Sequence, residues 1–534
     1  MKQRYRDFLK LNFYQIYPKS FKDSNNDGIG DFNGITEKIP YLAELGINAV
    51  WLSPCFESPG VDSGYDISDY RKVGPEFGTM EDFKKMIDTF HAHGIKVIVD
   101  LVVNHCSTQH RWFQEALKGP SSPYYDYFYW FDEKPNDWQS CFGGSAYEYV
   151  PSLKKYYYHA FAVEQADLNW ENPRVRKEVC DIVDFWIDFG VDGFRCDVLD
   201  MVSKDFKNGI SSNGPRLHEF LHEVFGREKC KNIYTVGECW GTTDEEVARL
   251  TGEDRGELVT AFRGGHPADL GPRFQYSDHV DYSRIHDHFA EKMEVNEKLD
   301  LVFPPFFENH DQCRCVSKLA NDKELRYESA TFFATILYTL RGTPFILQGQ
   351  EFGTPSASYS SVEDFNDVET LNFYRAHKGT MEEEELLALM SYDTRDNGRR
   401  PMVWDDTPTG GFNDGAKPWL ALHSERNRFS LTKDLASEKS IFRFFQKMIA
   451  FRKSSDALMF GHFEDATEER KDCFLFYREE GNEKLFIAIN YDKPSHIDIP
   501  EGYESVFGNY DTDPKGEFRP FETRIYKKKW LFNI

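Results

Sequence analysis

An arginine and an aspartate stand two residues apart in a short apolar stretch, GVDGFRCDV, at residues 190–198. Side chains alternate along a β-strand, so Arg195 and Asp197 would point to the same face. A buried guanidinium and a buried carboxylate are costly unless both are well paired. Two more acidic residues close other apolar stretches, Glu238 in IYTVGECW and Asp311 in DLVFPPFFENHD. The pattern indicates carboxyls gathered for chemistry rather than for packing.

Three carboxyls that face one pocket suit the hydrolysis of glycosidic bonds. That reaction needs one carboxylate that stays ionised and one carboxylic acid that stays protonated near neutral pH. The positive charge of Arg195 is expected to lower the pKa of Asp197 and keep it ionised as a nucleophile. Glu238 stands in the sequence GECW, an apolar setting that favours its protonated form and suits it as the acid.

The elements that must position these carboxyls are short apolar runs that alternate with amphipathic segments. Eight runs are predicted to be strands, at residues 13–18, 47–54, 96–105, 193–198, 233–240, 257–264, 300–311 and 344–351. Two of the amphipathic segments between them end in glycine, which is a signal for the end of a helix. We therefore expect an α/β fold, a (β/α)8 TIM barrel, whose functional groups gather at the carboxyl ends of the strands.

Two regions depart from this alternation. Residues 106–168 are rich in aromatic residues, glycine and proline, and are predicted to form a small domain inserted after the third strand. Residues 461–534 contain CFLFYREEGNEKLFIAINY, which is typical of antiparallel strands, and are predicted to form a C-terminal β-sandwich. The barrel is then expected to comprise residues 1–105 and 169–460.

Several motifs together carry a family resemblance. The segments DLVVNH, GFRCDV, GECW and ENHD, with GTPFILQGQE as the last barrel strand, resemble glycoside hydrolase family 13, the α-amylase superfamily. QADLNW (165–170) is similar to the signature of its oligo-1,6-glucosidase subgroup. SNGPRLHEFL, GGSAYEY and GECWGTT look closest to the glucan 1,6-α-glucosidases, also called dextran glucosidases. The sixth strand region, AFRGGHPADLG, and the residues Glu308 and Gln350 depart from the family pattern.

The resemblance implies a role for each motif residue. It makes Asp197 the nucleophile, Glu238 the acid/base and Asp311 the stabiliser of the transition state. It implies that His105 and His310 bind sugar hydroxyls, and that Asp66 and Arg399 hold the non-reducing end of the substrate. It also implies that Tyr65 and Phe142 form aromatic walls and that Trp240 is a platform for the next sugar.

Val198, which follows the nucleophile, resembles the residue of members that prefer α-1,6 bonds. The resemblance thus implies a retaining exo-α-glucosidase that releases glucose from the non-reducing ends of isomaltose, isomaltooligosaccharides and panose. The alternatives are an α-1,4-active α-glucosidase, a trehalose-6-phosphate hydrolase or a sucrose-active relative. A non-catalytic sugar-binding member is a further alternative, although such proteins usually lose a catalytic carboxyl.

The loop DSNNDGIGDF (23–32) offers oxygen ligands at alternating positions. The side chains of Asp23, Asn25, Asp27 and Asp31, with the main-chain carbonyl of Ile29, are the donors that a hard cation prefers. Relatives in the resembled family use this loop for a structural Ca²⁺, so calcium is the one cofactor expected, with no organic cofactor. The alternative is a metal-free turn rich in Asp and Asn.

Bulk properties limit the other classes. A formal net charge of −25 over 534 residues argues against nucleic acid or an anionic membrane as a partner, and we expect small oligosaccharides and a monomer. We expect no signal peptide and no membrane span. The ten scattered cysteines are expected to be reduced, in a cytoplasmic protein. HEFLH (218–222) matches the zinc peptidase motif HExxH, a remote alternative that lacks the usual continuation.

Overall fold

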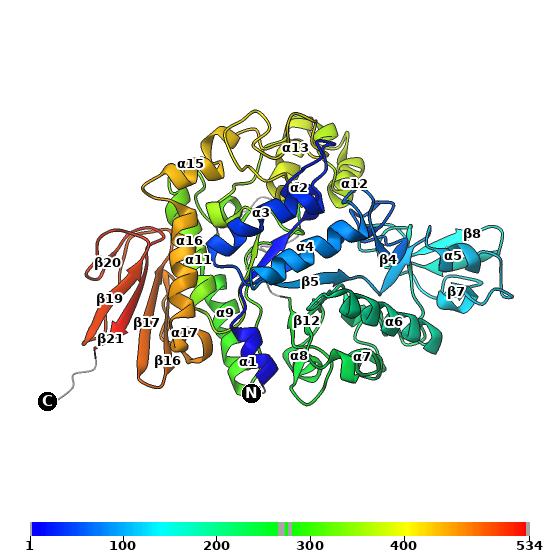
Figure 1. Ribbon diagram of the computed structural model, residues 1–534, viewed down its shortest axis with the longest axis horizontal. Coiled ribbons are helices and arrows are strands. Elements are labelled where there is room, and N and C mark those ends of the chain that lie inside the picture. The colour runs from blue at the N-terminus through cyan, green and yellow to red at the C-terminus, as the bar shows by residue number, and fades with distance from the viewer. Residues whose placement is uncertain (1–2, 265–272, 276–279, 530–534) are drawn as a thin grey trace.

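The computed structural model describes residues 3–264, 273–275 and 280–529 (Figure 1). A parallel sheet surrounded by helices forms the centre of the molecule. A small β-rich part lies at one end of the long axis, and the C-terminal antiparallel sheet lies at the other (Figure 1). No helix among the described residues is both long and apolar enough to cross a membrane.

The central sheet is the curled sheet of a TIM barrel. Its described strands pair in parallel in the order β13-β12-β11-β5-β2-β1-β14. Both faces are covered, so the strands are almost wholly buried and apolar, as parallel strands usually are. The strands are β1 (Phe13–Ile16), β2 (Ala49–Leu52), β5 (Lys96–Leu101), β11 (Gly193–Cys196), β12 (Tyr234–Glu238), β13 (Thr260–Phe262) and β14 (Phe345–Leu347).

The prediction of a seventh strand is wrong. Residues 300–311 form no strand, although they run between the two edge strands. The Thr260 hydroxyl of β13 donates to the Val302 carbonyl at 2.7 Å, and the Phe345 N–H of β14 donates to the Pro305 carbonyl at 2.9 Å. Pro304 and Pro305 have no N–H to give to a strand ladder. The segment therefore joins the sheet edges without regular pairing. Residues 265–271 of the unusual sixth region lie outside the described residues.

Helices follow the strands and cover the sheet. Helix α4 begins at a capping box, in which Thr79 and Asp82 each satisfy the other's main-chain N–H. Helix α6 begins after Asn172 and ends at Gly190, whose φ of 118° suits glycine. The main helices are α3 (Phe32–Leu45), α4 (Met80–Ala92), α6 (Pro173–Phe189), α7 (Leu217–Phe225), α8 (Asp244–Thr251), α9 (Ser283–Lys298), α11 (Arg326–Thr339) and α16 (Ile441–Lys453).

Shorter helices and one hairpin complete the barrel part. The hairpin β3 (Phe56–Glu57) with β4 (Asp69–Val73) follows β2. After β14, α12 and α13 form a layer beside the barrel with their own apolar cluster. The shorter helices are α1 (Gln3–Leu9), α2 (Pro18–Phe21), α10 (Cys315–Lys318), α12 (Val368–His377), α13 (Glu383–Asp393), α14 (Asp396–Arg399), α15 (Leu431–Ala436) and α17 (Asp456–Phe460).

The segment between β5 and α6 carries the small β-rich part. Strands β6 (His105–Ser107) and β10 (Gln165–Asp167) pair antiparallel where the segment leaves and rejoins the barrel. Between them lie α5 (Arg111–Ala116) and the sheet of β7 (Trp130–Phe131), β9 (Lys155–Tyr158) and β8 (Tyr147–Val150). An aromatic cluster fills this part. His105 is the first residue of β6, so it lies where this segment leaves the barrel.

The C-terminal part has two antiparallel layers. Five strands pair in the order β15-β16-β17-β21-β19, and β18 pairs with β20. Apolar side chains such as Phe486, Ile497 and Phe518 pack in one cluster that joins the two layers. The strands are β15 (His462–Asp465), β16 (Cys473–Glu480), β17 (Glu483–Asn490), β18 (Ser495–His496), β19 (Tyr503–Gly508), β20 (Glu517–Phe518) and β21 (Thr523–Lys528).

Candidate active site at the carboxyl ends of the barrel strands

A cavity of about 80 Å³ lies where the predicted carboxyls meet. Asp197 follows β11, Glu238 ends β12 and Asp311 follows the irregular segment after α9. Seven of the twelve predicted catalytic and substrate-binding residues line this cavity: Tyr65, His105, Phe142, Asp197, Val198, Glu238 and Asp311. The other five, Asp66, Arg195, Trp240, His310 and Arg399, are not among its lining residues.

Arg195 lies beneath the cavity and binds three carboxylates rather than one. Its Nη1 lies 2.6 Å from Asp197 Oδ1 and 2.7 Å from Asp100 Oδ1, and its Nη2 lies 2.6 Å from Glu238 Oε2. Asp100 pairs in register with Arg195 across β5 and β11, which explains the contact. Only 2% of Arg195 is exposed, so its charge is compensated by these carboxylates rather than by bulk solvent. The charge of the buried guanidinium is therefore balanced by carboxylates from three neighbouring strands.

This sharing corrects the expected electrostatics. Burial raises the pKa of Asp197 well above its usual range, Glu238 and Asp100 raise it further, and Arg195 only partly opposes them. Burial likewise raises the pKa of Asp100 to about 6, against the attraction of Arg195. The predicted low pKa of Asp197 is therefore wrong, although Arg195 does act to lower it. One positive charge is divided among three acids, so Arg195 does not offset the effect of burial on the pKa of Asp197 and Asp100.

Glu238 also differs from its expected apolar setting. Besides Arg195, its Oε1 accepts a hydrogen bond from Trp240 Nε1 at 2.5 Å, and its Oε2 accepts one from the Val198 N–H at 3.2 Å. Trp240 thus orients Glu238 in this structure. Val198 adopts a left-handed conformation, with φ 35° and ψ 46°, which is rare for a β-branched residue. This strained turn is what aims the Val198 N–H at the glutamate.

Asp311 has the opposite electrostatic environment. Its Oδ1 lies 2.9 Å from Arg399 Nη2 and 3.1 Å from Arg395 Nη1, and its Oδ2 lies 3.2 Å from His310 Nε2. Burial alone would raise the pKa of Asp311, but His310, Arg395 and Arg399 together hold it well below its usual range. Asp311 is therefore a fixed negative charge in the wall of the cavity. That charge suits the stabilisation of a developing positive centre.

The two predicted histidines lie in neutral form beside Tyr65. Burial lowers the pKa of His310 to about 3, and burial also lowers the pKa of His105. His310 stacks on Tyr65 with ring centroids 5.4 Å apart, and its Nε2 lies 2.6 Å from the Tyr65 hydroxyl. His105 lines the cavity, whereas His310 lies behind Tyr65. Neutral imidazoles can both donate and accept, which suits the binding of hydroxyls.

The pair predicted to hold the non-reducing end does not line the cavity. The Asp66 carboxylate accepts hydrogen bonds from Ser58 Oγ and from the N–H groups of Val61 and Asp62, so it shapes the loop after β2. Arg399 Nε donates to the His310 carbonyl at 2.8 Å, so it supports the residues around Asp311.

Three lining residues were missed from the sequence: Asp62, Arg395 and Phe161. Asp62 and Arg395 are an acid and an arginine, with Arg395 Nη2 4.0 Å from Asp62 Oδ1. Each stands four residues before the residue chosen from its motif, SPGVDSGYD or TRDNGRR. Those motifs were the available signal, but the first contains two aspartates and the second contains three arginines. Phe161 packs against Phe142 with centroids 5.7 Å apart and had no signal of its own.

The predicted calcium loop is held by hydrogen bonds of its own. Asp23 is 2% exposed and accepts from the N–H groups of Asn26 and Gly28, while Asp31 caps helix α3. Asp27 accepts from the Ile29 N–H at 2.8 Å, and Asn25 accepts from the Asp27 N–H at 3.0 Å. Within the described residues, no three His, Cys, Asp or Glu side chains form a metal cluster. A cation here would therefore need amide and main-chain carbonyl oxygens as well as carboxylates.

The HExxH match has no metal site. Both histidines lie on α7, where His218 Nδ1 lies 2.8 Å from Glu257 and His222 Nδ1 lies 2.8 Å from the Arg255 carbonyl. The two imidazoles therefore bind different neighbours instead of converging, and the peptidase alternative loses its basis.

Comparisons with known proteins agree with this geometry. A model of the alpha amylase catalytic domain matches residues 15–461. The chain is 40% identical to an oligo-1,6-glucosidase of Parageobacillus thermoglucosidasius, over 96% of this chain and 97% of the relative. It is also 40% identical to a glucan 1,6-alpha-glucosidase of Streptococcus pneumoniae, over 89% of this chain and 90% of the relative.

Among solved structures, the trehalose-6-phosphate hydrolase of Bacillus licheniformis superposes with a TM-score of 0.91 at 36% identity, covering 97% of this chain and 99% of that one. Family model, relatives and structural neighbour all extend across the barrel that carries the three carboxyls. The chain belongs to the alpha-amylase family, glycoside hydrolase family 13, and is a glycoside hydrolase.

Proposed function

We propose that the enzyme is a retaining exo-α-glucosidase that releases glucose from the non-reducing ends of α-1,6-linked gluco-oligosaccharides. The observation that carries the proposal is the small cavity in which Asp197 and Glu238 bind one guanidinium, with Asp62 and Arg395 in the same lining. The relatives named oligo-1,6-glucosidase and glucan 1,6-alpha-glucosidase support the α-1,6 assignment.

The chemistry follows from the positions of the two carboxyls. Asp197 Oδ1 is held by Arg195, which leaves Oδ2 to attack the anomeric carbon. As that C–O bond forms, the glycosidic C–O bond breaks and Glu238 gives its proton to the leaving oxygen. Glu238 then takes a proton from water, whose oxygen displaces Asp197 from the sugar.

A substrate panel tests the assignment. We expect glucose release from isomaltose and panose to exceed release from maltose, sucrose and trehalose-6-phosphate, compared as kcat/KM. Trehalose-6-phosphate is included because a trehalose-6-phosphate hydrolase is among the structural neighbours. A higher kcat/KM on that phosphorylated sugar than on isomaltose would replace the proposed substrate class with the neighbour's.

The configuration of the released sugar is the first prediction. Asp197 and Glu238 each lie 2.6 Å from the guanidinium of Arg195, which holds the two carboxyls near each other. A retaining mechanism needs carboxyls about 5–5.5 Å apart. NMR during the first minutes of reaction should show α-glucose before mutarotation. Initial appearance of β-glucose would contradict the nucleophilic role of Asp197.

A second prediction concerns Val198, which lines the cavity directly after the nucleophile. Its branched apolar side chain fills space and gives an acceptor sugar no hydroxyl to bind. An α-1,6-linked acceptor has an extra rotatable carbon and can avoid that bulk, whereas an α-1,4-linked acceptor cannot. We expect isomaltose to exceed maltose in kcat/KM by about 10–200-fold, or about 1–3 kcal/mol.

The variant Val198→Thr should narrow that ratio, because threonine keeps the branched shape and adds a hydroxyl. Val198→Ile is the matched control, since it adds only apolar volume and should keep or widen the ratio. An unchanged ratio in Val198→Thr would show that another residue sets the linkage preference.

We also propose that the loop at residues 23–31 binds a structural Ca²⁺. All its candidate donors are oxygens, which fits a hard cation. Binding to the folded state alone raises the melting temperature, so Ca²⁺ should raise it and EDTA lower it at fixed pH. Asp27→Ala should abolish the response, because Asp27 is an exposed member of the loop and caps no helix. No shift with either reagent would mean a metal-free turn.

We further propose that the enzyme works in a reducing compartment such as the cytoplasm. All ten cysteines are free in the structure, and eight of them are buried. A protein with buried free thiols is better suited to a reducing compartment than to an oxidising one.

A further inference from the structure

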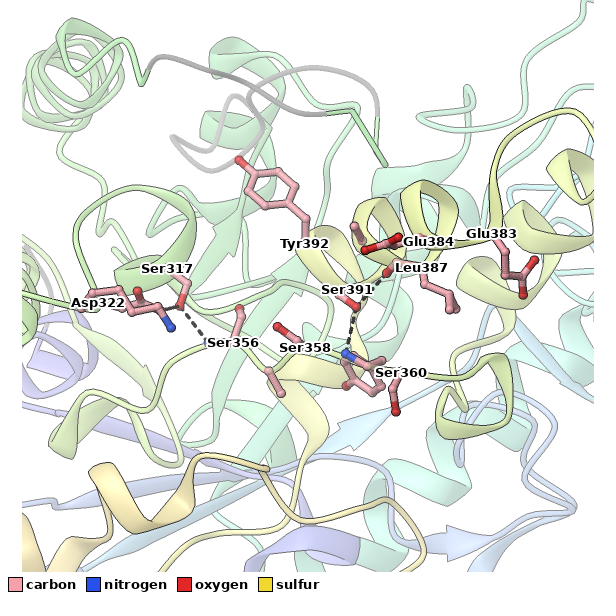
Figure 2. Close-up of a pocket in the computed structure, with 14 residues that line it drawn as sticks. Ser317, Asp322, Ser356, Ser358, Ser360, Glu383, Glu384, Leu387, Ser391 and Tyr392 are labelled. Atoms are coloured by element: carbon pink, nitrogen blue, oxygen red, sulfur yellow. Dashed lines mark hydrogen bonds between the residues drawn. The ribbon is translucent and has the colours of Figure 1, made fainter.

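A second hollow, of about 760 Å³, is far larger than the catalytic cavity and shares no lining residue with it (Figure 2). Its walls are the end of α10 with the residues that follow, the loop at residues 356–360, and helix α13. Figure 2 shows Ser317 and Asp322 on one side, Ser356 and Ser358 below, and the α13 side chains opposite them. We call this hollow the α13 groove.

The lining of the α13 groove combines hydroxyls with short apolar surfaces. Five serines come from three separate segments of the chain. Leu387, Ala388 and Tyr392 of α13 contribute apolar and aromatic surface between them. Sugars present both kinds of surface, since their ring C–H faces pack on apolar or aromatic groups and their hydroxyls form hydrogen bonds.

The charge of the groove disfavours anionic small molecules. Asp322, Glu383 and Glu384 line it with a single lysine, Lys323, in a protein of formal net charge −25. Phosphorylated and other anionic ligands would be repelled. A purely apolar ligand would bury hydroxyls and carboxylates without partners, which is costly. A neutral polyhydroxy ligand avoids both costs, because carboxylates accept hydrogen bonds from neighbouring hydroxyls.

The walls of the groove are fixed by hydrogen bonds rather than left to close on a ligand. Ser391 Oγ donates to the Leu387 carbonyl at 2.7 Å and accepts from the Tyr359 N–H at 3.0 Å. Ser317 Oγ donates to Asp322 Oδ2 at 2.5 Å and accepts from the Ser356 N–H at 2.8 Å. These bonds join all three wall segments, so the groove is formed before binding and little ordering entropy is lost on binding.

We propose that the α13 groove is a second, non-catalytic binding site for neutral gluco-oligosaccharides. The identity of the sugar rests on the proposed function; the groove itself does not. Tyr392 at its edge precedes Asp393, whose carboxylate holds Lys318 at 2.6 Å and the Phe274 N–H at 3.0 Å. Two residues later Arg395 reaches Asp311. A glucan bound in the groove is therefore held beside the segment that supports the catalytic cavity.

The first test counts sugar sites. The probe is isotope-labelled isomaltotriose, in equilibrium dialysis with the Asp197→Asn variant so that the sugar is not hydrolysed. We expect two molecules bound per chain at saturation. Adding Ala388→Trp, which fills the groove, should leave one. Adding Glu385→Trp, on the same helix but not among the lining residues, should leave two. One molecule bound in Asp197→Asn, or two bound after Ala388→Trp, would overturn the proposal.

The second test uses the enzyme with intact catalytic residues. A second site raises the local concentration of a long chain near the first. Ala388→Trp should therefore raise KM for a long α-1,6-glucan by about threefold or more, with kcat and the kinetics on p-nitrophenyl α-glucoside unchanged. Equal KM values for the two proteins on the long glucan would contradict a role in substrate capture. If the unaltered enzyme does not hydrolyse isomaltose, the proposed function is contradicted. The number of sugar molecules bound per chain would then still decide whether the groove is a second site.

Discussion

Replacing Asp197 by asparagine is expected to leave a folded enzyme whose kcat has fallen by several orders of magnitude. The amide cannot form the covalent bond to the anomeric carbon, so the two-step route is lost. The fold should survive, because the change is isosteric and burial already raises the pKa of Asp197 toward a neutral carboxyl. The measurements are kcat on isomaltose and the melting temperature of the same preparation.

Two controls sharpen this expectation. Glu238→Gln should also lose kcat on isomaltose, but should lose less on a substrate whose leaving group needs no proton, such as p-nitrophenyl α-glucoside. Asp197→Asn should lose activity on both substrates alike. Retention of more than about a tenth of the unaltered kcat in Asp197→Asn would exclude it as the nucleophile.

The sequence predicted the barrel well because its strands carry a local signal. Short apolar runs such as those of β5 and β11 are typical of strands that are buried in a parallel sheet. The seventh run failed because Pro304 and Pro305 cannot donate to a ladder, although the run is otherwise apolar. The apolar residues of this run are buried, as in a strand, but the two prolines prevent regular pairing.

The site was less predictable where it depends on contacts between distant segments. Arg195 and Asp197 were recognisable as a pair because they stand two residues apart at the end of one strand. That Asp100 and Glu238 share the same guanidinium follows only from the register of β5, β11 and β12. The choice of Asp62 over Asp66 likewise depends on which carboxylate the loop's own N–H groups occupy. The motifs were therefore readable from the sequence, whereas the member of each motif that lines the cavity was not.

Replacement of Arg195 is expected to have the second large effect, and its dependence on pH is the informative part. Arg195→Met would leave Asp100, Asp197 and Glu238 buried without their shared cation, a loss of about 3–5 kcal/mol for a broken buried pair. Burial already raises the pKa of Asp100 to about 6 and that of Asp197 well above its usual range, while Arg195 acts to lower both. Without the arginine, ionising these carboxyls in the folded state costs still more.

The sign of the pH dependence follows from that shift. A carboxyl whose pKa is higher in the folded than in the unfolded state destabilises the fold as pH rises above the unfolded value of about 4. Below that value the acids are protonated in both states, and the loss of Arg195 matters least. We therefore expect the melting temperature of Arg195→Met to be lower than that of the unaltered enzyme, and the difference to be larger at about pH 8 than at about pH 5.

Arg195→Lys is the matched control. It keeps the positive charge, so the deficit in its melting temperature should depend less on pH. It lacks the planar fork that holds two carboxylates, so it should still lose kcat. A deficit of Arg195→Met that is equal at both pH values would show that Arg195 contributes packing rather than charge, and the shared-cation account of the site would be wrong.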